Sequence, residues 1–124
     1  MKTFPQISEA ELEVMKVLWD LNCATSSQIA DRLIKVKKWK PKTVQTLINR
    51  LVAKGAVKAE KKSGKAFLYS PLIGESEFKA HASSSFLQKV FDGSLSLMIA
   101  SFIKEKKLSK REIEDLKKIL EEDV

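Results

Sequence analysis

The sequence predicts a mainly α-helical chain with one small β-hairpin, divided into an N-terminal domain at residues 1–73 and a helical domain at residues 74–124. Three observations predict this organisation. Three amphipathic helical segments precede two short strand segments, three more helical segments follow, and the chain is punctuated between the two sets by Pro71 and Gly74. The charge balance also changes at this punctuation.

The first predicted helix begins after Ser8. Ser8 and Glu11 have the spacing of a capping box, in which each side chain accepts a hydrogen bond from the backbone N–H of the other residue. Asn22 is a predicted stop. The apolar residues expected to face inward are Leu12, Met15, Leu18, Trp19 and Leu21.

Thr25 and Gln28 repeat the capping-box spacing and predict the start of a short second helix. Its expected inward residues are Ile29, Ala30, Leu33 and Ile34. The run from Lys35 to Lys40 that follows is expected to be a solvated loop, with contact to a phosphate backbone as the alternative. Trp39 in this run is expected to pack across the start of the next helix.

The third predicted helix extends from Pro41 to Lys54 and is closed by Gly55. Pro41 suits the first helical position, whereas Lys40 is a poor capping residue. The residues expected to face inward are Val44, Leu47, Ile48, Leu51 and Val52. The opposite face carries Lys42, Thr43, Gln45, Thr46, Asn49 and Arg50. These hydrogen-bonding groups suit phosphate oxygens and base edges, so the pattern favours a DNA-recognition helix.

Two short strands are expected next, at Val57 to Lys61 and at Ala66 to Ser70. The loop between them contains Lys62 and Lys65, which suit contact with a phosphate backbone. The order of three helices and a hairpin is that of a winged helix-turn-helix, in which the third helix enters the major groove of DNA.

The charge distribution agrees with a DNA-binding N-terminal half. Residues 1–71 contain 14 Lys and Arg against 6 Asp and Glu, while residues 72–124 contain 9 against 10, so the net +7 of the chain resides in the first part. Cys23 is a single cysteine and cannot form an internal disulfide. With no signal-peptide pattern and no apolar run of about 18 residues, a cytoplasmic location is expected.

The second half predicts three short helices, at Ser76 to Phe91, at Leu95 to Lys107, and after Ser109, where Glu112 repeats the capping-box spacing. Such short helices make a thin core, and a second copy of the chain is the simplest partner to cover it. The residues predicted to form the dimer interface are Phe86, Phe91, Leu95, Met98, Phe102, Ile113, Leu116 and Leu120.

Several segments together resemble the penicillinase and methicillin-resistance repressor family. Trp39 to Gly55, W-K-P-K-T-V-Q-T-L-I-N-R-L-V-A-K-G, is similar to the family signature W-S-P-K-T-x-x-T-L-x-x-R-L-x-x-K-G. The first helix from Ile7 to Trp19, the hairpin end F-L-Y-S-P, the segment S-S-F-L-Q-K-V-F-D-G-S-L and the tail L-S-K-R-E-I-E-D-L-K-K-I-L resemble it as well. The resemblance extends over nearly the whole chain.

The resemblance implies a cytoplasmic, homodimeric transcriptional repressor that binds an inverted-repeat operator upstream of β-lactamase or related cell-wall response genes. In the family, a membrane receptor with a zinc-protease domain senses β-lactam, and the repressor is then cut between Asn and Phe. The aligned bond is Ser101 to Phe102, where serine replaces the asparagine, so cleavage here is left open. The family's DNA-contacting positions correspond to Lys42, Thr43, Thr46 and Arg50.

Two other classes of function are weighed against this one. An enzyme is disfavoured because His81 is a lone histidine without a matching nucleophile, and no phosphate loop or Cys/His metal spacing is present; no cofactor, metal or small-molecule substrate is expected. The alternative function is a winged helix used only for protein contacts. It would favour exposed aromatic residues on the third helix, where Lys42, Gln45, Asn49 and Arg50 stand instead.

Overall fold

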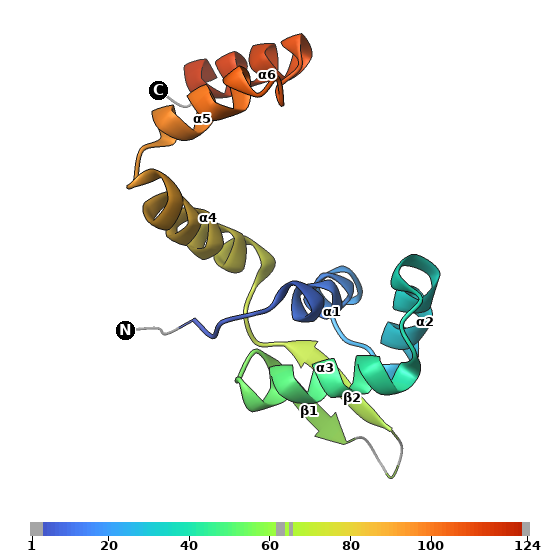
Figure 1. Ribbon diagram of the computed structural model, residues 1–124. Coiled ribbons are helices and arrows are strands. Elements are labelled where there is room, and N and C mark those ends of the chain that lie inside the picture. Colours follow the sequence, from blue (N-terminus) through green and yellow to red (C-terminus); the bar gives the residue numbers. More distant parts are fainter. Residues whose placement is uncertain (1–3, 62–63, 65, 123–124) are drawn as a thin grey trace. The chain divides into compact units, whose positions relative to one another are not determined.

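The computed structural model describes residues 4–61, 64 and 66–122, and within them the elements follow the predicted order (Figure 1). The helices and strands are α1 (Glu9–Leu21), α2 (Ser26–Lys37), α3 (Pro41–Ala53), β1 (Val57–Lys61), β2 (Phe67–Pro71), α4 (Glu75–Phe91), α5 (Leu95–Lys104) and α6 (Lys110–Glu122). The predicted fold class, mainly α with one β-hairpin, is confirmed.

The chain divides into two compact units, Met1–His81 and Ala82–Val124, and the division lies inside α4. The boundary predicted after residue 73 precedes α4. The helix that the sequence assigns wholly to the second domain is therefore shared between the two units.

The helix starts of the first unit are set by side-chain caps. Ser8 and Glu11 form both hydrogen bonds of a capping box, and Thr25 and Gln28 form the same pair at the start of α2. These bonds satisfy backbone N–H groups that have no partner within the helix. Lys40 gives α3 no side-chain cap, as predicted, and Pro41 occupies the first turn.

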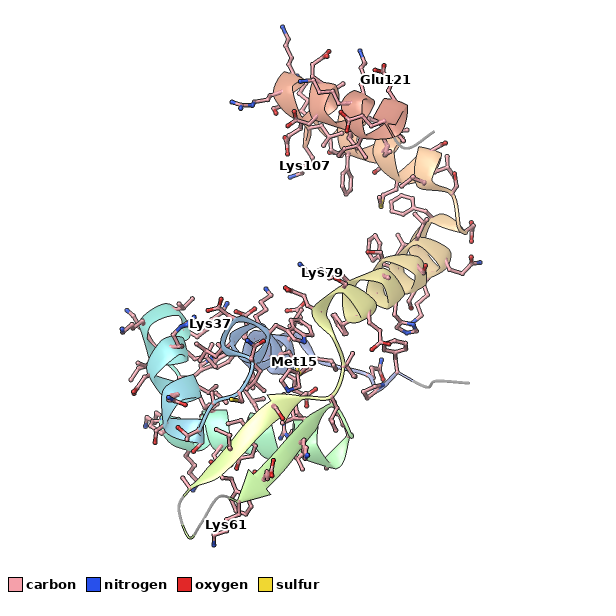
Figure 2. The ribbon with its side chains drawn as sticks, turned by 180° about the vertical axis from the view of Figure 1, so that it is seen from behind. Met15, Lys37, Lys61, Lys79, Lys107 and Glu121 are labelled. Atoms are coloured by element: carbon pink, nitrogen blue, oxygen red, sulfur yellow. The ribbon has the colours of Figure 1, made fainter. Side chains whose placement is uncertain are left out.

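One hydrophobic core joins the three helices and the hairpin. Its largest fully buried side chains come from α1, α2, α3 and β1, and they are Met15, Leu18, Ile29, Ile48, Leu51, Val14, Val44 and Val57. Figure 2 shows Met15 in this packed interior. The Trp19 indole Nε1–H donates to the carbonyl oxygen of Ile73 at 2.8 Å, and Trp39 packs against the edge of the core. The predicted inward faces are largely confirmed.

The core differs from the prediction in several details. Val14 and Val17 of α1 were not predicted to face inward, yet both are buried. Ile34, expected to face inward, is 49 % exposed, because it lies on the flank of the face formed by Ile29, Ala30 and Leu33. Glu11, expected only to cap α1, is buried.

The hairpin pairs β1 and β2 in antiparallel register from Val57 opposite Pro71 to Lys61 opposite Phe67. The second strand therefore lies one residue later than predicted. A further backbone bridge joins Tyr69 to Ala24, with N–H to O distances of 2.8 and 2.9 Å. This bridge fixes the hairpin to the connection between α1 and α2.

The second unit contains the end of α4 together with α5 and α6. Ser94 caps α5, and Ser109 and Glu112 form the predicted capping box at α6. The last turn predicted for α5 is absent, since the helix ends at Lys104 and Lys106 has a φ of 57°. Among the described residues of these three helices none is fully buried.

Within the part of the chain that the structure describes, no single helix is long and apolar enough to cross a membrane. α4 and α5 reach that length and composition only when they are counted together across the bend between them.

Candidate nucleic-acid interface

The two faces of α3 are separated as the sequence predicts. Val44, Leu47, Ile48 and Leu51 are buried, and Val52 is partly buried. On the opposite side Lys42, Thr43, Thr46, Asn49 and Arg50 are exposed, while Gln45 is half-buried. The helix thus presents one continuous polar surface, which we call the α3 outer face and define by these six residues.

The α3 outer face is positively charged. It carries the side chains of Lys42 and Arg50, and α3 contains no carboxylate. Neither cation forms an ion pair with any residue at the described positions 4–61, 64 and 66–122. Both charges are available to an external anion such as a phosphate group.

The Thr46 hydroxyl is already used within the helix. Its Oγ1 donates to the carbonyl oxygen of Lys42 at 3.1 Å. The oxygen lone pairs and the methyl group of Thr46 remain for outside contacts. Such a residue can accept a hydrogen bond or pack against a thymine methyl group.

Gln45 and Asn49 lie one turn apart and form a hydrogen-bonded pair. The Gln45 Nε2 donates to Asn49 Oδ1 at 2.9 Å and to the Tyr69 hydroxyl at 3.3 Å. Tyr69 belongs to β2, so this pair connects α3 to the hairpin. Tyr69 was not predicted as a site residue. Side chains along a strand point alternately to its two faces, and this alternation in β2 indicates that the Tyr69 side chain faces the core.

The hairpin extends the positive surface beyond α3. Lys58 and Lys61 on β1 are exposed, and Lys61 Nζ lies 5.8 Å from the centroid of the Phe67 ring. Figure 2 shows Lys61 at the far end of the strand. Lys62 and Lys65, the predicted contacts of the loop, lie outside the described residues.

The C-terminal end of α3 is anchored by an ion pair. Lys54 Nζ lies 2.6 Å from Glu11 Oε1 and donates to the carbonyl oxygen of Gln6 at 2.6 Å. Burial raises the pKa of Glu11, but hydrogen bonds from Lys54 and Ser8 and the charge of Lys54 outweigh burial and hold the pKa below its ordinary value. The carboxylate is therefore ionised and bound at neutral pH.

Seven of the eight predicted dimerisation residues fall into two groups in the second unit. Leu95, Met98, Phe102, Leu116 and Leu120 line one apolar groove between α5 and α6, which lie side by side (Figure 1). The rings of Phe86 and Phe91 contact each other on α4, with centroids 6.1 Å apart. Ile113 is partly buried and does not line the groove.

The bond between Ser101 and Phe102 lies inside α5 and not in a loop. Ser101 is half-buried and Phe102 is 39 % exposed. A protease that binds an extended chain would reach this bond only after α5 has unwound locally.

Comparison with known proteins gives the relatives of this chain. The family model described as penicillinase repressor matches residues 7–122. The penicillinase repressor of Bacillus licheniformis is 43 % identical over 98 % of this chain and 94 % of its own length. The methicillin resistance regulatory protein MecI of Staphylococcus aureus is 40 % identical over 96 % of this chain and 95 % of its own length.

A solved structure resembles the first unit. It is the structure of the Bacillus licheniformis BlaI monomeric form in complex with the blaP half-operator, which is 47 % identical in sequence to this chain. The likeness covers 62 % of this chain and 93 % of the BlaI chain, with a TM-score of 0.54. The likeness to this structure agrees with the order of three helices and a hairpin in the first unit, which is that of a winged helix-turn-helix. The chain belongs to the penicillinase repressor family.

Proposed function

We propose that the chain is a transcriptional repressor that binds double-stranded operator DNA through α3. The observation that carries the proposal is the α3 outer face, an exposed polar surface without a carboxylate, whose two cations, Lys42 and Arg50, form no ion pair with another described residue. The BlaI structure in complex with a half-operator supports the proposal, since that protein has the same fold and 47 % identity.

The residues of the α3 outer face divide by their chemistry. Lys42 and Arg50 suit phosphate oxygens or guanine edges, whereas Thr43 and Thr46 suit small hydrogen-bonding and methyl contacts. Lys62 and Lys65 of the hairpin loop are assigned to the flanking phosphate backbone. Gln45 and Asn49 complete the proposed contact surface.

The repressor is proposed to act as a homodimer. The groove between α5 and α6 exposes large apolar side chains, including Phe102 at 39 %, Leu95 at 49 % and Leu120 at 55 %. A second copy that covers these residues would remove the exposed apolar surface from water. The two-fold symmetry of such a dimer would match an inverted-repeat operator.

The repressor is proposed to control the genes of a β-lactamase or of cell-wall stress responses, as expected in this family. Its proposed location is the cytoplasm. A membrane-bound zinc-protease receptor is the proposed signalling partner. Release of the repressor would involve the Ser101 to Phe102 bond, where serine occupies the position of the family's asparagine. Catalysis by the chain itself is not part of the proposed function.

The competing function is a winged helix that binds only proteins. Selection from a pool of randomised DNA duplexes separates the two functions. A repressor enriches an inverted repeat with two equal half-sites, and this enrichment is weaker with the Arg50→Ala variant. A pool that stays random with the wild-type chain at low salt would favour the protein-interaction module.

A further inference from the structure

We infer that the Tyr69 hydroxyl is a positioning group for base readout: it holds the Gln45 side chain, and through it that of Asn49, in one position on the α3 outer face. This inference rests on the proposed function, because it concerns how the face distinguishes bases. The inference assigns a role to Tyr69, the tyrosine of the F-L-Y-S-P segment. This residue is buried in the core and is not exposed to solvent.

Tyr69 is held rigidly from two sides. Its backbone pairs with Ala59 in the hairpin and with Ala24 in the connection between α1 and α2. Its side chain is 6 % exposed and belongs to the hydrophobic core. A ring fixed in this way places its hydroxyl at a defined point beside α3.

The hydroxyl of a buried tyrosine requires a hydrogen-bond partner, and here the partner is Gln45. Gln45 Nε2 lies 3.3 Å from the Tyr69 hydroxyl and 2.9 Å from Asn49 Oδ1. An amide nitrogen has two N–H groups, so these two bonds use both donors. These two bonds leave the oxygen of Gln45 as an acceptor.

The same chain of bonds orients Asn49. Since Asn49 Oδ1 accepts from Gln45, its Nδ2 remains as a donor on an exposed side chain. The pair therefore places one amide acceptor and one amide donor side by side. An acceptor suits the amino group of adenine or cytosine, and a donor suits a purine N7 or another acceptor of a base edge.

A glutamine side chain without such a contact can move among several rotamers, and it then discriminates bases poorly. The Tyr69 hydroxyl provides a contact that keeps the Gln45 side chain in one place. Removal of the hydroxyl is expected to lower discrimination between base pairs while binding to random duplex, which depends on phosphate contacts, persists.

The test compares Tyr69→Phe with the wild-type full chain, since phenylalanine keeps the ring in the core and removes only the hydroxyl. Ser70→Ala is the matched control, because it removes a hydroxyl from the next residue of β2, whose side chain points to the opposite side of the strand. Binding is measured to the selected inverted repeat, to its single-base-pair variants and to random duplex.

We expect Tyr69→Phe to lose about two- to tenfold in discrimination at the base pairs read by Gln45 and Asn49, with random-duplex binding unchanged. In a Gln45→Ala background the same substitution should have no further effect. Discrimination that stays at the wild-type level, or a loss that persists in the Gln45→Ala background, would overturn the inference. An equal loss on all duplexes would overturn it too.

A second measurement, made without DNA, separates this inference from the proposed function. In NMR spectra of the wild-type chain the Gln45 side-chain amide should show contacts to the Tyr69 ring, and its signals should shift in Tyr69→Phe but not in Ser70→Ala. Unshifted signals would refute the positioning contact. If the contact is present and the wild-type chain has no base preference, the proposed function fails and the readout role with it.

Discussion

Lys54 Nζ and Glu11 Oε1 lie 2.6 Å apart and join the end of the recognition helix to the first turn of α1. Glu11 is 2 % exposed, and its carboxylate also accepts the backbone N–H of Ser8. A buried carboxylate is stable only when its charge is paired and hydrogen-bonded. This ion pair therefore fixes the C-terminal end of α3, on which the candidate interface depends.

Replacing Glu11 by glutamine should destabilise the first unit by about 1 to 3 kcal/mol, because a hydrogen bond to a charged group is lost and Lys54 keeps an unpaired charge. Urea unfolding at pH 7 measures this loss. Glu13→Gln is the control, since it removes the same charge from the exposed pair with Lys16. Equal effects of the two substitutions would contradict the role of the buried pair.

The same ion pair predicts a pH dependence. The pKa of Glu11 is lower in the folded chain than its ordinary value of 4.5, so the unfolded chain binds the proton more readily. The stabilisation is fully present above 4.5 and is lost as the pH falls below that value through the folded-state pKa. The stability difference between wild type and Glu11→Gln should shrink over this acidic range, and a difference that grows there would be inconsistent with a lowered pKa.

Arg50→Ala and Thr46→Ala should weaken binding to the operator more than binding to random duplex. Base contacts of this kind contribute about 1 to 3 kcal/mol of discrimination, whereas phosphate contacts act equally on all sequences. Arg111→Ala in α6 is the charge-matched control. Equal losses on operator and random DNA would exclude base readout by Arg50 and Thr46 and leave only phosphate contact.

Truncation after His81 should give a folded monomer with weaker operator binding. In the proposed dimer the second unit links two DNA-binding units, one on each half-site, and the truncation removes this link. Loss of such linkage reduces affinity by about 10² to 10⁴. The cut keeps Phe78, whose ring lies 5.5 Å from that of Trp19, in the first unit. Sedimentation of the fragment as a dimer would show that the second unit is not the dimerisation region.

Leu120→Glu should dissociate the proposed homodimer, since it places a charge in the apolar groove between α5 and α6. Leu72→Glu is the control, because Leu72 is exposed to a similar extent, 53 % against 55 %, but belongs to the first unit. Sedimentation equilibrium should report a monomer for the first variant and a dimer for the second. The reverse result would move the dimer interface away from the groove.

The order of elements could be predicted because its signals are local. The capping pairs Ser8 with Glu11 and Thr25 with Gln28 lie within one helical turn, and Pro41 fixes the start of α3. The outer and inner faces of α3 follow from helical periodicity alone. All of these features are contained in short stretches of sequence.

The features that escaped prediction depend on distant residues. Glu11 is buried because Lys54, 43 positions later, reaches its carboxylate. Tyr69 is held beside Gln45 by a backbone bridge to Ala24. A bridge between such distant residues cannot be predicted from a short stretch of sequence. Ile34 is exposed because the core ends before the flank of α2 on which it lies. Contacts between remote segments arise only when the whole unit has folded.

The most direct test of DNA binding by the α3 outer face is the affinity for inverted-repeat and random duplexes as the salt concentration rises. The account predicts binding to both at low salt, tighter for the inverted repeat, and a logarithmic affinity that falls with slope about −0.9 for each phosphate neutralised. For the Arg50→Ala variant, the affinity should fall less steeply with salt, or the preference for the inverted repeat over random duplex should be smaller. Absence of binding at low salt, or an affinity that does not change with salt, would contradict the account.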